Sequence, residues 1–168
     1  MTAKYAAGTE TPVSRSREEI EKTLKRYGAH GFMYGDTGGV AAVMFEMRER
    51  RYRIELRYPP ETDFMSPRRT SQASLKAARD AEIRRLWRAL LMVIKAKLEA
   101  AQSGITTIED EFLSATVMAN NQTVKEWIEP QISEMYQSGQ MPDFLPGIAP
   151  PSQKRIADPA IIEGEVSY

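Results

Sequence analysis

A strict alternation of apolar and polar residues marks one segment in the first half of the chain. The apolar positions are Tyr52, Ile54, Leu56 and Tyr58, and the positions between them are Arg51, Arg53, Glu55 and Arg57. A period of two is typical of a strand with one buried and one solvated face. The pattern predicts a strand over 52–58 that ends at Pro59 and has a cationic outer face.

Two further strands are expected just before it. Gly31–Tyr34 is a short apolar run and Val40–Met47 is a longer one. Gly35–Gly39 separates the two runs, and repeated glycine permits the positive φ angles of a tight turn. Arg48–Arg51 forms the second connection. Three strands joined by short connections predict an antiparallel meander.

Apolar residues spaced three and four apart predict one helix on each side of the meander. Ser16 and Glu19 have the spacing of a capping box, so the first helix is expected over about 16–27. The second runs from Gln72 to Ser103, because Gly104 is a typical stop. Its expected apolar face consists of Ile83, Leu86, Trp87, Leu90, Val93, Ile94 and Leu98.

Two more capping boxes follow. Thr106 with Glu109 predicts a short helix through about residue 114, and Thr123 with Glu126 predicts a final helix to Ser138. Pro130 lies inside that last helix and should kink or split it.

The predicted fold class is therefore α+β: a helix, a three-stranded antiparallel meander, a long helix and a small helical unit. Residues 1–13 are expected to form a mobile arm. Residues 14–140 form one domain with a helical subunit over 105–139. Residues 141–168 contain five prolines and predict an extended acidic tail.

Composition excludes several classes of chemistry. The 168-residue chain has no cysteine and one histidine, His30. Disulfides, thiol chemistry and sites built from two imidazoles are thereby excluded. No apolar run approaches the roughly 20 residues that span a bilayer, so we expect no membrane contact and a cytoplasmic location. No catalytic motif stands out, and we expect neither an enzyme nor a cofactor.

The zero net charge hides a strong asymmetry. Residues up to Lys97 include 20 basic and 12 acidic side chains, a net charge of +8, and the remainder carries −8. Such a division suggests an anionic partner for the basic part.

The candidate binding residues are cations on the third strand, its neighbouring turn and loop, and the long helix. They are Arg48, Arg50, Arg51, Arg53, Arg57, Arg68, Arg69, Arg84, Arg85, Arg88 and Lys95. Arginine suits phosphate because its planar donors bind two oxygens at once. Phe32 or Tyr34 could stack on bases if they share the arginine face. An open cationic sheet of this kind favours single-stranded nucleic acid. The alternative is a solvated surface whose arginines pair with the chain's own carboxylates.

Other motifs have simpler interpretations. Lys97 falls inside the apolar face of the long helix and needs a carboxylate partner from Glu109–Glu111. That acidic run suits the start of a helix better than a metal site. Gly35–Gly39 lacks the Gly-Lys-Ser/Thr ending of a phosphate loop. We interpret His30 as structural.

Three resemblances follow from these residues. The element order over 16–103 resembles a double-stranded-RNA-binding domain, and a meander followed by a long helix resembles the core of phage-type single-strand annealing proteins. The stretches Arg84–Glu99 and Thr123–Trp127, with Gly139–Pro142, are similar to small uncharacterised proteins of phages and prophages over residues 84–147. This last resemblance implies a mobile-element origin and assigns no activity.

The leading hypothesis is a phage-type accessory protein that binds nucleic acid. The alternative is an interaction protein, such as a phage inhibitor of host defence, which binds another protein or assembles with itself. Opposite charges on one chain suit self-association, and the C-terminal tail is a further candidate for contact with a protein partner.

Overall fold

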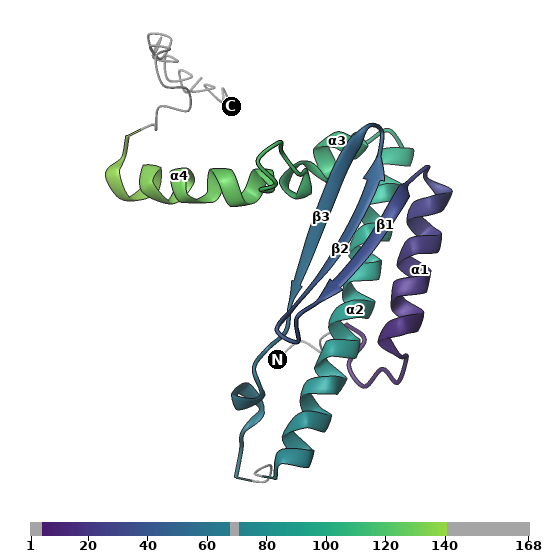
Figure 1. The fold of residues 1–168 in the computed structure, drawn as a ribbon, viewed down its shortest axis with the longest axis vertical. Coiled ribbons are helices and arrows are strands. Elements are labelled where there is room, and N and C mark those ends of the chain that lie inside the picture. Colours follow the sequence, from purple (N-terminus) through teal and green to yellow (C-terminus); the bar gives the residue numbers. More distant parts are fainter. Residues whose placement is uncertain (1–4, 68–70, 141–168) are drawn as a thin grey trace, which may run out of the picture. The chain divides into compact units, whose positions relative to one another are not determined.

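The computed structural model describes residues 5–67 and 71–140, and the chain divides into two compact units, Met1–Glu129 and Pro130–Tyr168. The element order confirms the predicted α+β fold (Figure 1). The elements are α1 (Val13–Arg26), β1 (His30–Asp36), β2 (Val40–Met47), β3 (Arg50–Arg57), the 3₁₀ turn η1 (Glu61–Phe64), α2 (Gln72–Gln102), α3 (Ile108–Glu111), the 3₁₀ turn η2 (Leu113–Ala115) and α4 (Val124–Ser138).

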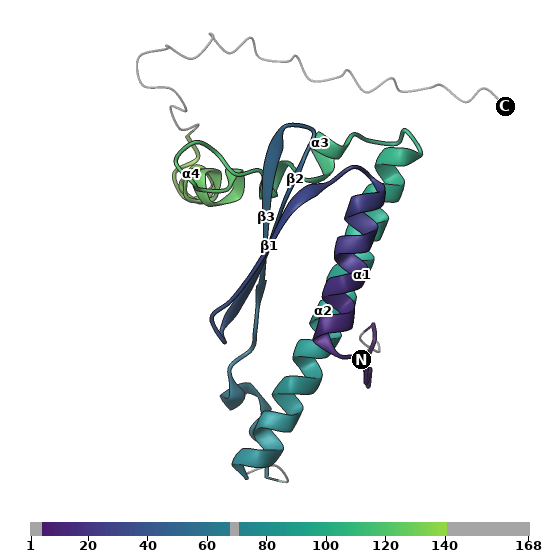
Figure 2. The same ribbon diagram turned by 45° about the vertical axis from the view of Figure 1, so that its right-hand side comes forward.

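The three strands form the predicted antiparallel meander, in the order β1-β2-β3. Phe45 lies opposite Tyr52, and Val43 lies opposite both Tyr34 and Ile54. Burial alternates along β2 because successive side chains point to opposite faces of a sheet. The helices α1 and α2 both lie on one side of the sheet (Figure 2). The core therefore fills the layer between one sheet face and two helices.

The connection between β2 and β3 is shorter than predicted. Met47 pairs with Arg50, so the loop contains only Arg48 and Glu49. Both loop residues have positive φ, 51° and 62°. This is the geometry of a two-residue hairpin whose twist matches that of the strands. Positive φ is unfavourable for residues other than glycine, but here it gives the loop the twist of the two flanking strands.

Large side chains from every layer form the core. Fully buried residues of α2 meet those of α1 and the inner face of β2; they are Trp87, Leu91, Ile94, Leu98, Ile20, Leu24, Val43 and Phe45. Phe45 stacks on Tyr52 with ring centroids 5.2 Å apart and meets Phe112 edge-on at 5.8 Å. Phe112 follows α3, so this aromatic cluster joins the sheet to the segment after α2.

The predicted start of the first helix is wrong by one turn. The helix begins at Val13, and its preceding residue, Pro12, makes no side-chain cap. Ser16 is fully buried inside the helix, four residues before Ile20 on the same face. Its small side chain is therefore part of the packed face, and the capping box with Glu19 does not form.

The two later capping boxes have different outcomes. The second lies one residue further on than predicted, because Thr107 accepts a hydrogen bond from the backbone N–H of Asp110, and α3 ends at Glu111. The third is confirmed in both directions, between the backbone N–H and side-chain oxygen of Thr123 and Glu126. The helix α4 continues through Pro130 and is not split there.

Two further expectations about side-chain faces are wrong. Phe32 and Tyr34 pack against the core, and the Phe32 ring stacks on Phe45 at 6.5 Å. They do not share the arginine face of the sheet, because odd positions of β3 lie on its other side. Val93 of α2 is 50% exposed, so it is not part of the buried face.

A chain of polar contacts joins four elements at one end of the core. The indole N–H of Trp87 donates to the Tyr58 hydroxyl at 2.9 Å, which donates to Asp36 at 3.1 Å. Arg17 of α1 pairs with the same carboxylate at 3.1 Å and lies over the Trp87 ring at 4.6 Å. Burial raises the pKa of Asp36, but hydrogen bonds from Gly38, Tyr58 and Arg17 outweigh it, so the pKa is lowered overall.

We predict that Tyr58→Phe lowers the free energy of unfolding by about 1–3 kcal/mol, because it leaves the buried Trp87 N–H without an acceptor. Urea denaturation measures the change. Tyr52→Phe is the matched control: the Tyr52 hydroxyl is buried and has no hydrogen-bond partner among the described residues. Its removal should leave stability unchanged or raise it. Equal losses in the two variants would contradict the role given to Tyr58.

Candidate nucleic-acid interface

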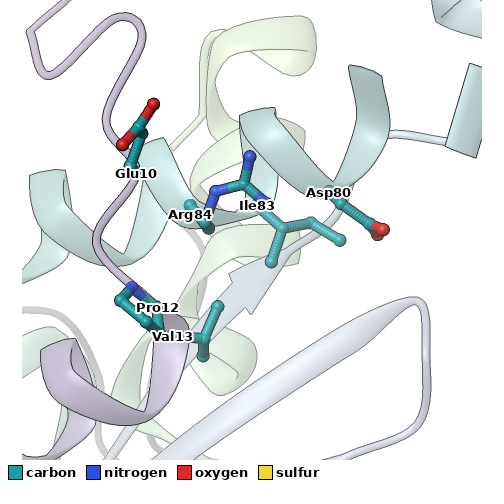
Figure 3. A pocket seen from close by; sticks show the side chains of 6 residues that line it. All are labelled: Glu10, Pro12, Val13, Asp80, Ile83 and Arg84. Carbon is teal, nitrogen blue, oxygen red and sulfur yellow. The ribbon is translucent and has the colours of Figure 1, made fainter. Parts of the chain in front are cut away.

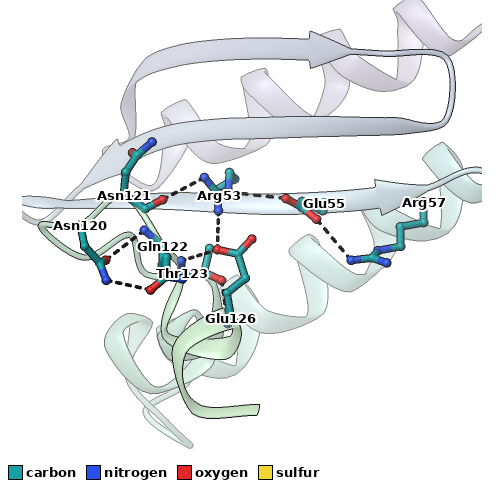
Figure 4. Close-up of polar contacts among 8 residues, drawn as sticks. All are labelled: Arg53, Glu55, Arg57, Asn120, Asn121, Gln122, Thr123 and Glu126. Atoms are coloured by element: carbon teal, nitrogen blue, oxygen red, sulfur yellow. Dashed lines mark hydrogen bonds and ion pairs between the residues drawn. The ribbon is translucent and has the colours of Figure 1, made fainter. Parts of the chain in front are cut away.

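The central arginine of the predicted sheet face is engaged within the protein. Arg53 is only 17% exposed, because the segment from Asn121 to Glu126 lies against it (Figure 4). Its guanidinium pairs with Glu126 and Glu55 and donates to the Asn121 carbonyl at 3.1 Å. The backbone N–H of Thr123 lowers the pKa of Glu126 most, and Arg53 adds to this effect. Arg53 is therefore a structural residue.

The other strand and turn arginines are more open. Arg57 is 83% exposed and is 3.9 Å from Glu55, and Arg48 pairs with Glu109 at 3.3 Å. Arg50 and Arg51 are exposed and form no ion pair with any carboxylate of the described residues.

Carboxylates and methionines interrupt this sheet face. In the strand register Glu46 lies opposite Arg51, and Met44 lies between Arg53 and the exposed Met33. The sheet is therefore a mixed surface and not the continuous cationic platform that the alternation in β3 predicted.

The first two cations of the α2 group contact the segment that precedes α1. Arg84 lies beside Glu10 and Val13 in a pocket of about 440 Å³ and donates to the Thr9 carbonyl at 3.4 Å (Figure 3). Arg85 forms a two-point pair with Glu82, with both distances 2.8 Å. Arg84 and Arg85 therefore bind groups within the protein itself. Arg68 and Arg69 lie outside the described residues.

The last two cations of the group, Arg88 and Lys95, lie along α1. Arg88 pairs with Glu19 at 3.0 Å. Lys95 lines a cleft of about 360 Å³ between the two helices, together with Lys22 and Arg26 of α1. Both helices run in the same direction (Figure 1). Two cations of α1, Lys22 and Arg26, and one of α2, Lys95, therefore border the same cleft, which we call the α1–α2 cleft.

Glu19 is the one carboxylate among the described residues that line this cleft. It lies 3.0 Å from Arg88 and 3.5 Å from Arg15. Contact with Arg88 lowers the pKa of Glu19, and the charges of Lys95 and Arg15 add to that effect, whereas burial opposes it. The direction of this shift agrees with the excess of cations around Glu19.

Sequence reasoning missed the α1 half of this surface. Arg15, Lys22 and Arg26 recur with helical spacing on the side of α1 away from Ile20 and Leu24. That spacing is visible in the sequence. What the sequence does not show is that this row lies beside Arg88 and Lys95, about 70 residues later.

One other sequence prediction has a clear outcome. Lys97 is paired as expected: its ammonium group donates to the Glu111 carboxylate at 3.0 Å and to the Glu111 carbonyl at 2.6 Å. Among the described residues there is no group of three metal-ligating side chains, and no described helix is long and apolar enough to cross a membrane.

Comparison with protein-family models, curated proteins and solved structures found no match. The resemblances to double-stranded-RNA-binding domains, annealing proteins and phage proteins stay predictions. The function has to be inferred from the geometry of this chain.

We predict that Arg53→Ala lowers the free energy of unfolding by about 1–2 kcal/mol, because it leaves Glu126 and the Asn121 carbonyl without their donor. Arg57→Ala, in the same strand, should change stability by less than about 0.5 kcal/mol. Chemical denaturation of both variants tests the distinction. A loss of stability confined to Arg57→Ala would show that the two residues have been assigned the wrong roles.

Proposed function

We propose that the protein binds nucleic acid through its phosphate backbone, with the α1–α2 cleft as the main contact surface. The observation that carries this proposal is the convergence of three cations on one cleft, with Lys22 and Arg26 on one side and Lys95 on the other. These three side chains make no ion pair with a carboxylate of the described residues. A polyanion is therefore the ligand class whose charge matches the cleft.

The spacing of the cations favours a repeating anion. Lys22 and Arg26 are four residues apart, a separation of about 6 Å along the helix axis. Arg15 and Arg88 extend the same surface toward the start of α1. A ligand with phosphates at regular intervals can contact several of these cations at once, whereas an isolated phosphate reaches only one part of the cleft.

The position of the aromatic rings changes the expected substrate. Phe32 and Tyr34 pack on the core, so they support no stacking on splayed bases. The contacts available in the cleft are to phosphate and carry no sequence information. We therefore propose binding that is insensitive to base sequence and that accepts single strands and duplexes alike.

We predict that the double variant Lys22→Glu/Arg26→Glu weakens binding to a labelled oligonucleotide at least about tenfold and makes the dependence of log K on log salt shallower by about 2 units. Fluorescence anisotropy with single-stranded and duplex probes at several salt concentrations measures both. Arg57→Glu is the control, because Arg57 is highly exposed on the other side of the sheet. The control should have a smaller effect on both quantities.

No binding of either probe by the wild-type protein at low salt would reject the proposed function. Binding that Arg57→Glu weakens more than the α1 double variant does would instead move the contact surface to the sheet.

Self-association is the second candidate function, and the solvent side of α2 supports it. Met92 and Val93 are 43% and 50% exposed, and Ala89 and Ala96 lie on the same side of the helix, opposite Trp87. An antiparallel copy of α2, related by a two-fold axis near Met92, would place Ala89 opposite Ala96 of the second copy. Small residues at those positions permit close approach of the helices.

The same arrangement is electrostatically favourable. It would bring Arg85 of one copy close to Glu99 of the other, twice about the two-fold axis. Arg85 pairs with Glu82 and its side chain is only 15% exposed, so it would share its guanidinium between Glu82 and the second copy's Glu99, which is exposed and makes no ion pair with the described residues. Opposite charges at both ends of an apolar contact favour a second copy of this chain as the occupant.

We predict that Ala96→Glu converts a concentration-dependent dimer into a monomer, because it introduces two charges into the apolar contact. Sedimentation velocity measures the change. Ala77→Glu is the matched control, since Ala77 is exposed on the same helix about five turns away. A wild-type protein that is monomeric at all concentrations, or a dimer that Ala96→Glu leaves intact, would reject this candidate.

A further inference from the structure

Glu19 occupies a position in the α1–α2 cleft that suits an anion from outside. It is the acidic member of a lining otherwise made of Lys22, Thr23, Arg26 and Lys95. Its carboxylate lies 3.0 Å from Nη1 of Arg88 and 3.5 Å from Nε of Arg15. Neither contact has the geometry of a hydrogen bond, and Nη1 of Arg88 is buried without a hydrogen-bond partner among the described residues, so Glu19 is held by charge attraction that an arginine also offers to a phosphate.

The local structure holds this carboxylate in place. Glu19 lies one turn before Thr23, whose hydroxyl donates to the Glu19 carbonyl at 2.7 Å. Thr23 is itself buried, and Ile20 beside it is fully buried, so this part of α1 is fixed against the core. These contacts fix the backbone at Glu19, and the ion pairs with Arg88 and Arg15 hold its side chain at the edge of the cleft.

A resident carboxylate changes what an incoming phosphate meets. Lys22, Arg26 and Lys95 can receive a phosphate directly. A phosphate that approaches Arg88 must first replace Glu19, and it meets the repulsion of that carboxylate until it does so. The binding free energy of a polyanion is reduced accordingly.

Building on the proposed function, we propose that Glu19 is an intramolecular competitor for the phosphates of the ligand and sets the affinity of the α1–α2 cleft. It keeps Arg15 and Arg88 occupied in the free protein. Only a ligand that already contacts the neighbouring lysines and Arg26 gains enough from the cleft to displace it. The residue thereby weakens binding of anions that make few contacts.

The test compares Glu19→Gln with Glu18→Gln and wild type, by anisotropy with one labelled single-stranded oligonucleotide over a range of salt concentrations. Both variants change the net charge by the same amount on the same helix, but Glu18 is exposed and is not among the residues that line the cleft. Glutamine keeps the size of glutamate and an oxygen that can accept from Arg88.

We expect Glu19→Gln to bind about three- to tenfold tighter than Glu18→Gln, with a salt dependence steeper by about 0.7, the value for one additional phosphate contact to a single strand. A merely structural role for Glu19 would not steepen the salt dependence. Glu19→Asp, which retains the charge, should show neither effect. Thermal unfolding of each variant checks that α1 remains folded.

The outcomes separate the two proposals. If wild type binds and Glu19→Gln binds no tighter than Glu18→Gln, the role of Glu19 is rejected and the proposed function stands. If only Glu19→Gln binds, competition by Glu19 is supported and nucleic-acid binding by the wild-type protein is rejected. If none of the proteins binds, both proposals are rejected.

Discussion

Arg17 lies over the Trp87 ring and pairs with Asp36, and these contacts set the position of α1 relative to α2. The Trp87 indole is fully buried and donates to Tyr58, so its orientation is fixed from the sheet side. Arg17 then binds α1 to that ring and to the end of β1. Arg17 lies two residues before Glu19 and Trp87 one residue before Arg88, so this contact sets the level along the two helix axes at which Glu19 and Arg88 meet. The placement of Lys22 and Arg26 beside Lys95 therefore depends on a contact with the buried Trp87.

About half of the described basic residues up to Lys97 form ion pairs with carboxylates in the folded protein. Arg53 meets Glu126, Arg48 meets Glu109, and both of these partners lie in the acidic part of the sequence. Part of the positive charge at the sheet is therefore neutralised by carboxylates of the segment that follows α2. Of the cations that make no ion pair with the described residues, Lys22, Arg26 and Lys95 lie together at the α1–α2 cleft, whereas Arg50 and Arg51 are exposed at the sheet.

Local patterns in the sequence were sufficient for the fold and insufficient for the site. The alternation in β3, the periodicity of α2 and the capping box at Thr123 each depend on neighbouring residues, so they could be read directly. Ser16 and Glu19 have the same spacing, but no capping box forms there, because contacts between elements bury Ser16 within the helix. The placement of Lys22 and Lys95 at one cleft and the burial of Arg53 also depend on contacts between distant segments. No single-sequence pattern specifies them.

One wall of the cleft is a helix of only 14 residues, Val13–Arg26, that reaches its place through contacts with α2 more than 50 residues away. Such a helix is marginal on its own and depends on docking for its order. The cleft exists only while α1 is docked, so the binding of any ligand in it and the docking of α1 are thermodynamically linked. Any ligand of the cleft would therefore also act on the order of α1, whereas the β2–β3 hairpin forms no part of the cleft.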